Sequence, residues 1–469
     1  MSQSISQDRG VISLIRDAVR GEVHYDFTQE RIGRAIALLS IPMVLEMMME
    51  SLFAVVDMFW VAHLGADAVA TVGLTEAVLT ILFTIAMGLS IATTAMVARR
   101  IGEKNPKEAA EVAVQALLLG VIVAGIIGLA GAWFAEDVLR LMGASASIVS
   151  TGSGYTRVIY ASSVGVMLLF LINAVFRGAG DAVLAMRVLW IGNLINIVLN
   201  PLLIFGLGPF PKLGVIGSAA GTTVGRLTGV VIGMWLLTTG RSRVVVHIHH
   251  LRFRAEMMAR LVRMSVGGIF QYFVGAASWI AMVRMAAWFG SAAVAGYTVA
   301  IRIIIFAILP SWGMANAAAT LVGQNLGAKK PERAEQSVWR AGFYNMIFLG
   351  LVAATFIIFA APLIGLFTTD PAVVPIAVSA LRFISCGYIF YAWGMVTVQA
   401  FNGAGDTITP TVLNIAFYWV LRMPLAWLLA FKLNGGINGV LISIPVADAL
   451  VATTAVILFR RGKWKQQRA

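Results

Sequence analysis

The chain has 469 residues, of which 59% are hydrophobic and only 12% are charged. A water-soluble protein of this length does not need so many apolar residues, so the composition excludes a soluble globular fold and indicates a membrane protein. The formal net charge of +13 is compatible with nucleic-acid binding, but no aromatic residues interleave with the basic ones, so we expect no nucleic-acid partner.

Residues 1–37 come before the first long apolar run and carry five acidic residues, which is not the pattern of a cleavable secretion signal. Ile12, Ile15 and Val19 recur at helical spacing, which predicts a short helix lying against the lipid headgroups. We therefore expect an N-terminal segment, 1–37, that stays in the cytoplasm.

Apolar runs of about 20 residues, each long enough to cross a hydrocarbon layer of roughly 30 Å as a helix, recur along the rest of the chain. They predict an all-α polytopic membrane protein with twelve transmembrane helices, embedded in lipid. The predicted spans are 38–62, 72–97, 112–134, 155–176, 187–208, 215–239, 265–289, 296–321, 339–362, 377–401, 411–431 and 437–459.

The basic residues indicate how these helices are oriented. With the N-terminus inside the cell, the predicted inner segments hold 26 of the 35 Lys and Arg residues. Because inner loops of membrane proteins are enriched in Lys and Arg, both termini are predicted to be cytoplasmic and the protein to lie in the inner membrane. The basic stretch 240–264 is then a cytoplasmic linker and 460–469 a cytoplasmic tail.

The two halves of the chain are related as copies. The tetrapeptide Gly-Ala-Gly-Asp at 178–181 returns 225 residues later at 403–406, each time two residues after a Phe. Each copy has six spans, so the copies insert in the same orientation, as parallel repeats with a central cavity between them. The lobes are predicted at 38–239 and 265–459. The same offset relates Ser40 to Ser265, Gly65 to Gly290, Gly102 to Gly327 and Pro106 to Pro331.

The first span carries three acidic residues, which are costly inside a membrane and therefore suggest function. At 100° per residue, Glu46, Glu50 and Asp57 fall on one helix stripe about 40° wide. Such a stripe is typical of a proton or cation path. Pro42, in the cytoplasmic part of the same span, removes one helical hydrogen bond and predicts a bend.

The fifth and sixth spans add polar groups at a depth similar to that of Asp57. Asn196 and Asn200 lie one turn apart in the fifth span, and Thr222 begins a polar stripe in the sixth. Hard cations prefer such oxygen ligands. The sequence therefore predicts a cation-coupling site in the first lobe.

Several short motifs, in order along residues 35–460, resemble the multidrug and toxic compound extrusion (MATE) family. They are Asp57-Met58-Phe59-Trp60-Val61 before Leu64-Gly65, Val97-Ala98-Arg99-Arg100-Ile101-Gly102, and the two copies of Phe-x-Gly-Ala-Gly-Asp. The resemblance implies efflux of amphipathic, often cationic, organic compounds, driven by sodium or protons. It also implies a conformational role for Pro42, coupled to Asp57.

In one branch of the family, the cation site of the first half combines a first-span Asp, a fifth-span Asn and Asp one turn apart, and a sixth-span Thr. Asp57, Asn196 and Thr222 match this set, whereas Asn200 stands in place of the second Asp. Either Glu50 supplies the missing carboxylate, or the acids exchange protons instead. Protons are favoured, with Glu50 as the better proton carrier. Glu46 is a candidate relay, and Arg226 is placed to pair with one of the acids as a purely structural alternative.

The second copy lacks this chemistry. At the positions equivalent to Glu46, Glu50 and Asp57 it has Gln271, Gly275 and Met282, so coupling is expected only in the first lobe. Its remaining charged residues within the spans are expected to be structural or to extend toward the headgroups. Arg422 and Asp448 are placed to form an ion pair, and Arg284 and Arg302 lie near the outer ends of their spans.

These features predict a monomeric antiporter that is not an enzyme and needs no cofactor beyond the transported H⁺ or Na⁺. The candidate walls of a drug cavity are Met47, Met48, Tyr272, Phe273 and Trp279.

The alternative within transport is a flippase for a lipid-linked precursor. A strongly basic cavity would favour that alternative. An intramembrane enzyme would need paired acids or metal-spaced His on facing spans. No metal site is expected at the linker residues His247, His249 and His250, and Glu76 is expected at the outer interface.

Overall fold

A computed structural model describes residues 11–21, 25–247, 250 and 252–467 of the chain. His249 and parts of the predicted terminal segments, 1–10, 22–24 and 468–469, lie outside the described residues. The described residues form helices and connecting turns without any β-strand, which confirms the predicted fold class. The first lobe consists of α2 (Ile32–Ala62), α3 (Ala66–Gly102), α4 (Pro106–Trp133), α5 (Ala135–Leu141), α6 (Ala146–Ala161), α7 (Ser163–Ala179), α8 (Ala182–Phe205) and α9 (Val215–Thr238).

The second lobe repeats this order, with one difference in its fifth span. That span alternates between α-helix and π-helix, as α16, η2, α17 and η3. The elements are α10 (Ala255–Ala287), α11 (Ser291–Gly327), α12 (Pro331–Ile358), α13 (Ala360–Gly365), α14 (Val374–Cys386), α15 (Tyr388–Ala404), α16 (Ile408–Asn414), η2 (Ile415–Leu421), α17 (Arg422–Trp427), η3 (Leu428–Lys432), α18 (Gly436–Arg460) and the short 3₁₀-helix η4 (Lys463–Gln466).

Ten of these helical segments are long and apolar enough to cross a membrane. Two bent pairs, α6 with α7 and α14 with α15, bring the number to as many as twelve if each pair is one span; they bend by 41° and 55°. Helix α10 begins at Ala255, so the last ten residues of the predicted linker 240–264 are helical. The protein is therefore a multi-pass membrane protein.

The repeated motifs adopt the same backbone conformation in both lobes. Lys104 and Lys329 each have a φ of 58° in the turns that precede α4 and α12. Gly180 and Gly405, with φ of 84° and 92°, end α7 and α15 in the left-handed region, where glycine carries no Cβ penalty. The 225-residue offset is therefore a structural repeat.

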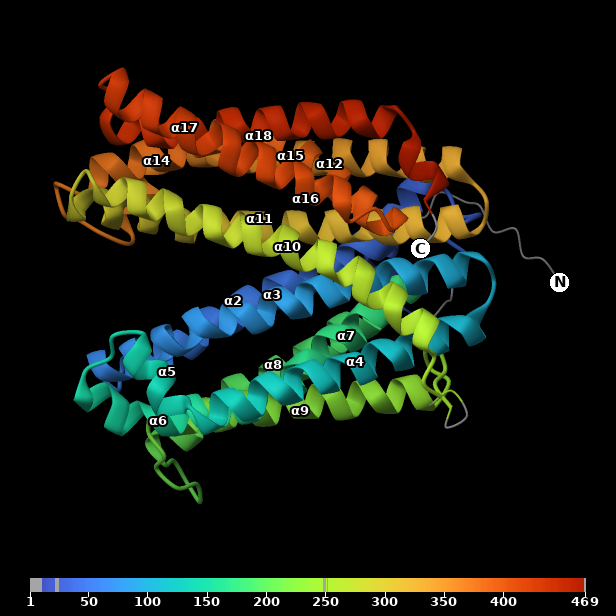
Figure 1. Cartoon of the computed structure of the whole chain (residues 1–469), viewed down its shortest axis with the longest axis horizontal. Helices are drawn as coiled ribbons and strands as arrows, with labels where there is room; N and C mark the ends of the chain where they lie inside the picture. The colour runs from blue at the N-terminus through green and yellow to red at the C-terminus, as the bar shows by residue number, and fades with distance from the viewer. Residues whose placement is uncertain (1–10, 22–24, 248–249, 251, 468–469) are drawn as a thin grey trace.

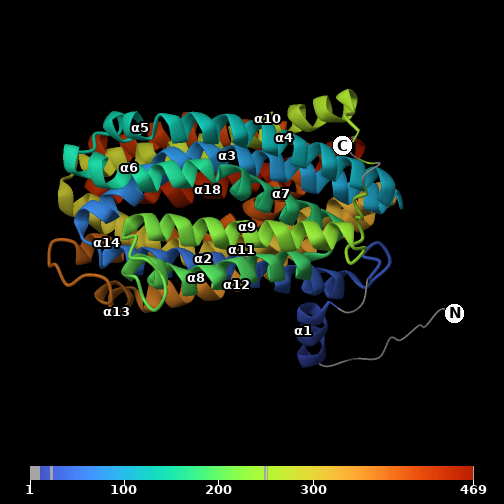
Figure 2. The same ribbon diagram turned by 90° about the horizontal axis from the view of Figure 1, so that it is seen from below.

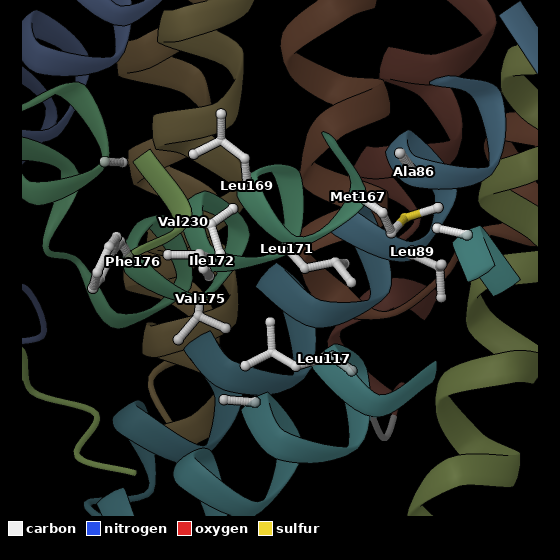
Figure 3. Close-up of a cluster of buried hydrophobic side chains, with 14 of the residues drawn as sticks. Ala86, Leu89, Leu117, Met167, Leu169, Leu171, Ile172, Val175, Phe176 and Val230 are labelled. Atoms are coloured by element: carbon white, nitrogen blue, oxygen red, sulfur yellow. The ribbon is translucent and has the colours of Figure 1, made fainter. Parts of the chain in front are cut away.

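Figure 1 shows the two lobes side by side, with their long helices running along one common axis. The turns at 103–105 and 328–330 and the linker after Thr238 lie at one end of the bundle, which we call the linker face. Each lobe has an apolar core, and a third apolar cluster joins α2 to helices of the second lobe. Figure 3 shows the packing of α3, α4 and α7 in the first lobe. Outward-facing side chains such as Leu129 and Trp133 are 76% and 82% exposed, as expected for helices surrounded by lipid.

The aspartates of the repeated motif have different roles in the two lobes. Asp406 accepts a hydrogen bond from the backbone N–H of Thr409 and thus caps the start of its helix. Asp181 instead accepts bonds from the Ser242 hydroxyl and the Arg243 backbone N–H, both at 2.8 Å. In the first lobe the motif therefore fixes the start of the linker.

Helix α1 (Val11–Arg20) confirms the predicted N-terminal helix, and Figure 2 shows it lying crosswise to the long axis of the bundle. The guanidinium of Arg187 donates to the carbonyl of Arg20 at 2.6 Å and fixes its end. The apolar side chains of Ile12 and Ile15 are 85% and 46% exposed. Contact of this face with lipid headgroups stays a prediction.

The segment after α1 joins the two lobes on the linker face. Arg243, from the linker, donates to the carbonyl of Tyr25 at 2.6 Å, and Lys330, from the second lobe, donates to the carbonyl of Thr28 at 2.9 Å. Burial would raise the pKa of Asp26, but hydrogen bonds from Thr28 and the charge of Lys330 lower the pKa below its ordinary value. Asp26 is therefore ionised at neutral pH, and its negative charge attracts Lys330 of the second lobe to this segment.

The two lobes also approach closely at the linker-face ends of α3 and α11. A Cβ built on Gly102 would lie 2.0 Å from the carbonyl oxygen of Gln324, and a Cβ built on Gly327 would lie 2.1 Å from that of Arg99. The amide of Gln324 donates to the carbonyl of Gly178 at 3.0 Å across the same boundary. The glycines of the repeat therefore allow the linker face to close.

We expect Gly327→Val to separate the lobes at this face, because its side chain would overlap the backbone of α3. Spin labels on Lys107→Cys and Glu332→Cys, in a Cys386→Ser background, should show a longer mean distance by double electron–electron resonance. Gly350→Val is the matched control, since a Cβ there would meet no atom within 4 Å. An unchanged distance in Gly327→Val would contradict the close-packing argument.

Candidate functional site

Asp57 of α2 lies at the centre of a buried polar cluster in the first lobe; the residue is 8% exposed. Its Oδ1 accepts hydrogen bonds from the side-chain amide of Asn200 at 2.5 Å and from the hydroxyl of Ser218 at 3.0 Å. Helices α8 and α9 supply these donors, so a single carboxylate oxygen joins three helices. Ser218, at the start of α9, was missed by the sequence analysis because a lone serine in a span carries no signal.

Asn196 connects the other predicted ligands. Its amide donates to Thr222 Oγ1 at 2.9 Å and to Asn200 Oδ1 at 3.3 Å, while its own Oδ1 is buried without a hydrogen-bond partner in the described part of the chain. The structure thus brings Asn196, Asn200 and Thr222 together with Asp57 in one hydrogen-bonded cluster, whereas Glu50 has other partners. A buried oxygen without a donor is suited to a cation or a protonated group.

Glu50 lies two turns before Asp57 on α2 and is only partly buried. Its carboxylate accepts a hydrogen bond from the amide of Asn193 at 3.0 Å and lies 3.7 Å from Arg226 Nη2. The guanidinium of Arg226 also lies over the ring of Phe53, 5.6 Å from its centroid. Of the acids that Arg226 was placed to reach, it pairs with Glu50.

Glu76 of α3 is exposed. No hydrogen bond or ion pair joins its carboxylate to Asp57 among the described residues. Its position at the outer interface therefore stays a prediction.

Glu46, the third acid of the stripe, forms a separate buried ion pair. Its Oε1 accepts a hydrogen bond from Arg177 Nη1 at 2.8 Å and lies 3.4 Å from the amide of Asn173. Arg177, predicted to belong to an inner segment, lies in the last turn of α7, but its side chain is turned into the protein and the residue is only 9% exposed. The acid stripe is therefore divided between two sites.

Helix α2 is continuous through Pro42, so the proline does not end it. Close to it, the backbone of Met43 and Val44 touches Gly313 of α11; a Cβ on Gly313 would lie 2.7 Å from the backbone nitrogen of Val44. The helix that carries Asp57 in the first lobe thus packs directly against the second lobe beside Pro42.

A chamber of about 430 Å³ lies between α3 of the first lobe and the helices of the second. Tyr272 and Trp279, both predicted cavity residues, line it, and Arg422 and Asp448 are its charged wall residues. Met47 lines a smaller adjoining cavity. Phe273 and Met48 do not line these cavities and are 58% and 52% exposed.

The predicted ion pair of the second lobe is present: Arg422 Nη2 lies 3.7 Å from Asp448 Oδ1. Arg284 and Arg302 are exposed, which suits side chains that extend toward the headgroups. Helix α10 presents the neutral Gln271, Gly275 and Met282 where α2 presents its acids. The two lobes therefore have the same architecture but different chemistry.

The comparison with known proteins agrees with this arrangement. The MatE family model matches the chain twice, over residues 42–202 and 268–428, one match in each lobe. The chain is 24% identical to the probable multidrug resistance protein YoeA of Bacillus subtilis (strain 168), covering 93% of this chain and 95% of that protein. It is 26% identical to an FAD transporter of Shewanella oneidensis, in a match that covers 92% of this chain and 95% of that protein.

Among solved structures, an outward-facing conformation of a multidrug resistance MATE family transporter superposes with a TM-score of 0.88. The sequence identity is 27%, and the match covers 95% of this chain and 100% of that chain. Since the family model covers most of both lobes and the fold agrees over nearly the whole chain, the protein belongs to the multidrug and toxic compound extrusion (MATE) family of efflux transporters.

Proposed function

We propose that this transporter is a proton-coupled antiporter that exports amphipathic organic compounds. The observation that carries the proposal is the buried Asp57, held by Asn200 and Ser218 beside the unpartnered oxygen of Asn196. Protons are preferred to sodium because Asn200 supplies an amide where a sodium site would gain a second carboxylate.

Protonation of Asp57 changes what its carboxyl group can bond. The ionised form only accepts hydrogen bonds, as it does from Asn200 and Ser218, whereas the protonated form also becomes a donor. Asn196 Oδ1 lies in the same cluster and lacks a donor. Proton uptake therefore favours a different packing of α2 against α8 and α9.

Helix α2 is the element that carries this change to the other lobe. It contacts α11 at Met43 and Val44, next to Pro42, where the missing N–H weakens the helix. A bend at Pro42 would alter this contact and so bias the two lobes between outward-open and inward-open states. Pro42 thus couples Asp57 to alternating access.

The chamber between the lobes is the place for the exported compound. Its volume is in the range of sites for drug-sized ligands, and its aromatic and Met side chains suit varied apolar shapes. In the chamber wall, Arg422 lies beside Asp448, so its positive charge has a negative partner and the chamber is not strongly basic. A strongly basic cavity would have favoured a flippase for a lipid-linked precursor. The names of the multidrug resistance relatives support drug export.

The proposal includes the cellular placement. The linker face carries the basic turns and the terminal elements α1 and η4, so by the distribution of positive charge it faces the cytoplasm, with the protein in the inner membrane. Each lobe buries its own core and the chamber is complete within one chain, which supports a monomer as the transporting unit.

The coupling ion is tested in vesicles of defined orientation that contain the purified protein. A proton gradient at equal sodium should drive accumulation of a fluorescent drug, and a sodium gradient at fixed pH should not. A response to sodium alone would replace the proton by sodium as the driving ion. Failure of both gradients to drive any substrate would contradict coupled antiport.

A further inference from the structure

The chamber between the lobes has, on its second-lobe wall, a charged pair that the coupling mechanism does not use. Arg422 is 5% exposed and Asp448 belongs to the adjacent α18, yet their closest atoms are 3.7 Å apart. This is a loose, single contact rather than the bidentate geometry that an Arg–carboxylate pair prefers. The pair is therefore only partly satisfied.

Arg422 has hydrogen-bonding capacity to spare. Its Nε is buried without an acceptor among the described residues, and its guanidinium lies over the ring of Tyr418, 4.2 Å from the centroid. An unmatched buried donor on a charged group is costly, so its presence in a cavity wall indicates a ligand that completes it.

The backbone at Arg422 is also unusual. The residue stands between two π-helical segments, η2 and η3, whereas the corresponding α8 of the first lobe is α-helical throughout. Single π-helical turns occur frequently at functional sites, where they reorient side chains. This observation is independent of the side-chain contacts.

Aromatic side chains surround the pair. Tyr272, Tyr388, Tyr391 and Tyr418 line the chamber, and Tyr272 makes an edge-to-face contact with Trp312 at 5.9 Å. Such walls accept a flat ring system, and tyrosine hydroxyls can donate to an acceptor at its edge.

We propose that this chamber is a specificity site for planar aromatic compounds that bear a carboxylate, with the carboxylate bound by Arg422. Asp448 is the counter-ion that the guanidinium holds when no such compound is bound. The inference rests on the proposed export function, because it names a class of exported compound.

The geometry favours an anionic group over a purely cationic one. A cation approaching Asp448 would also approach the guanidinium of Arg422, which lies 3.7 Å from that carboxylate, and the like charges would repel each other. An incoming carboxylate would instead bind the guanidinium of Arg422 in place of Asp448.

The test compares two dyes that share one ring system. Rhodamine B has a free carboxylate, and its ethyl ester does not. Equilibrium binding to the purified, detergent-solubilised protein is measured by fluorescence anisotropy. Wild type should prefer rhodamine B, and Arg422→Gln should weaken its binding about tenfold or more while leaving ester binding unchanged. Arg302→Gln, an exposed arginine of the same lobe, is the matched control and should behave as wild type.

The partner of the pair gives a second variant with the opposite expectation. Asp448→Asn removes the competing carboxylate and should tighten rhodamine B binding. If Arg422→Gln does not fold because Asp448 is left uncompensated, the double variant Arg422→Gln/Asp448→Asn buries no lone charge and should lose the preference for rhodamine B. A purely structural pair predicts no tightening in Asp448→Asn.

Three results would overturn the inference: no preference for rhodamine B in wild type, equal weakening of both dyes in Arg422→Gln, or rhodamine B binding in Asp448→Asn that is no tighter than in wild type. Binding is measured without any ion gradient, so these outcomes are separate from the proposed antiport. A protein that keeps the dye preference but exports neither dye under any gradient would contradict the proposed function alone.

Discussion

Asp57→Asn should abolish the release of protons, or of sodium, that accompanies drug uptake into everted vesicles. The substitution keeps the size of the side chain but removes its charge and its ability to exchange a proton. Asn200 and Ser218 would still find an oxygen to bond, so the cluster around position 57 keeps most of its contacts. The coupled flux should therefore fall to the level of vesicles without the protein, while the protein still folds and binds drug.

Asp137→Asn is the matched control. This aspartate lies in the short helix α5, where its exposed side chain pairs with Arg140. Its replacement should leave coupled transport at the wild-type level. Wild-type ion release in Asp57→Asn would exclude this aspartate as the coupling group and leave Glu50 as the candidate.

The second large effect is expected for stability, at the buried pair of Glu46 and Arg177. Arg177→Met leaves the Glu46 carboxylate, 1% exposed, without its cation, and should lower the free energy of unfolding by about 3 to 5 kcal/mol. The measurement is reversible denaturation in mixed micelles, followed by tryptophan fluorescence. Arg140→Met, in an exposed ion pair, should change the unfolding free energy by only about 0 to 1 kcal/mol.

The double variant Glu46→Gln/Arg177→Met distinguishes an ion pair from a proton relay. With neither charge present, much of the lost stability should return, since the main cost of the single variant is an uncompensated buried charge. If Glu46 is only a structural partner, the double variant should still couple ion and drug fluxes. Loss of coupling in a stable double variant would assign Glu46 to the proton path.

The membrane fold and its duplication could be predicted because they depend on local, repeated signals. Runs of apolar residues indicate the membrane spans, and the 225-residue offset indicates two copies. Neither signal depends on which residues line the cavity between the copies. The cluster that we propose as the coupling site was also accessible to sequence reasoning. Asp57, Asn196, Asn200 and Thr222 stand at a similar depth in their spans, and helical geometry is regular enough for depth to place them together.

Contacts between different spans were harder to predict, because sequence spacing does not determine which faces of two helices meet. Ser218 reaches Asp57, and Arg177 turns inward to Glu46. The sequence counted Arg177 as part of an inner segment because the span prediction ended one residue before it.

The amino-acid pattern alone was enough to predict a two-copy membrane transporter in which only the first copy carries acids in its first span. The partner of each of these acids became known only from the packing of the helices: Arg226 for Glu50, Arg177 for Glu46, and uncharged donors for Asp57. The physical reason is that burying an acid in a membrane is unfavourable wherever it lies, so its presence can be read locally as a sign of function. Its chemistry is set by the charges and donors that neighbouring helices bring to it.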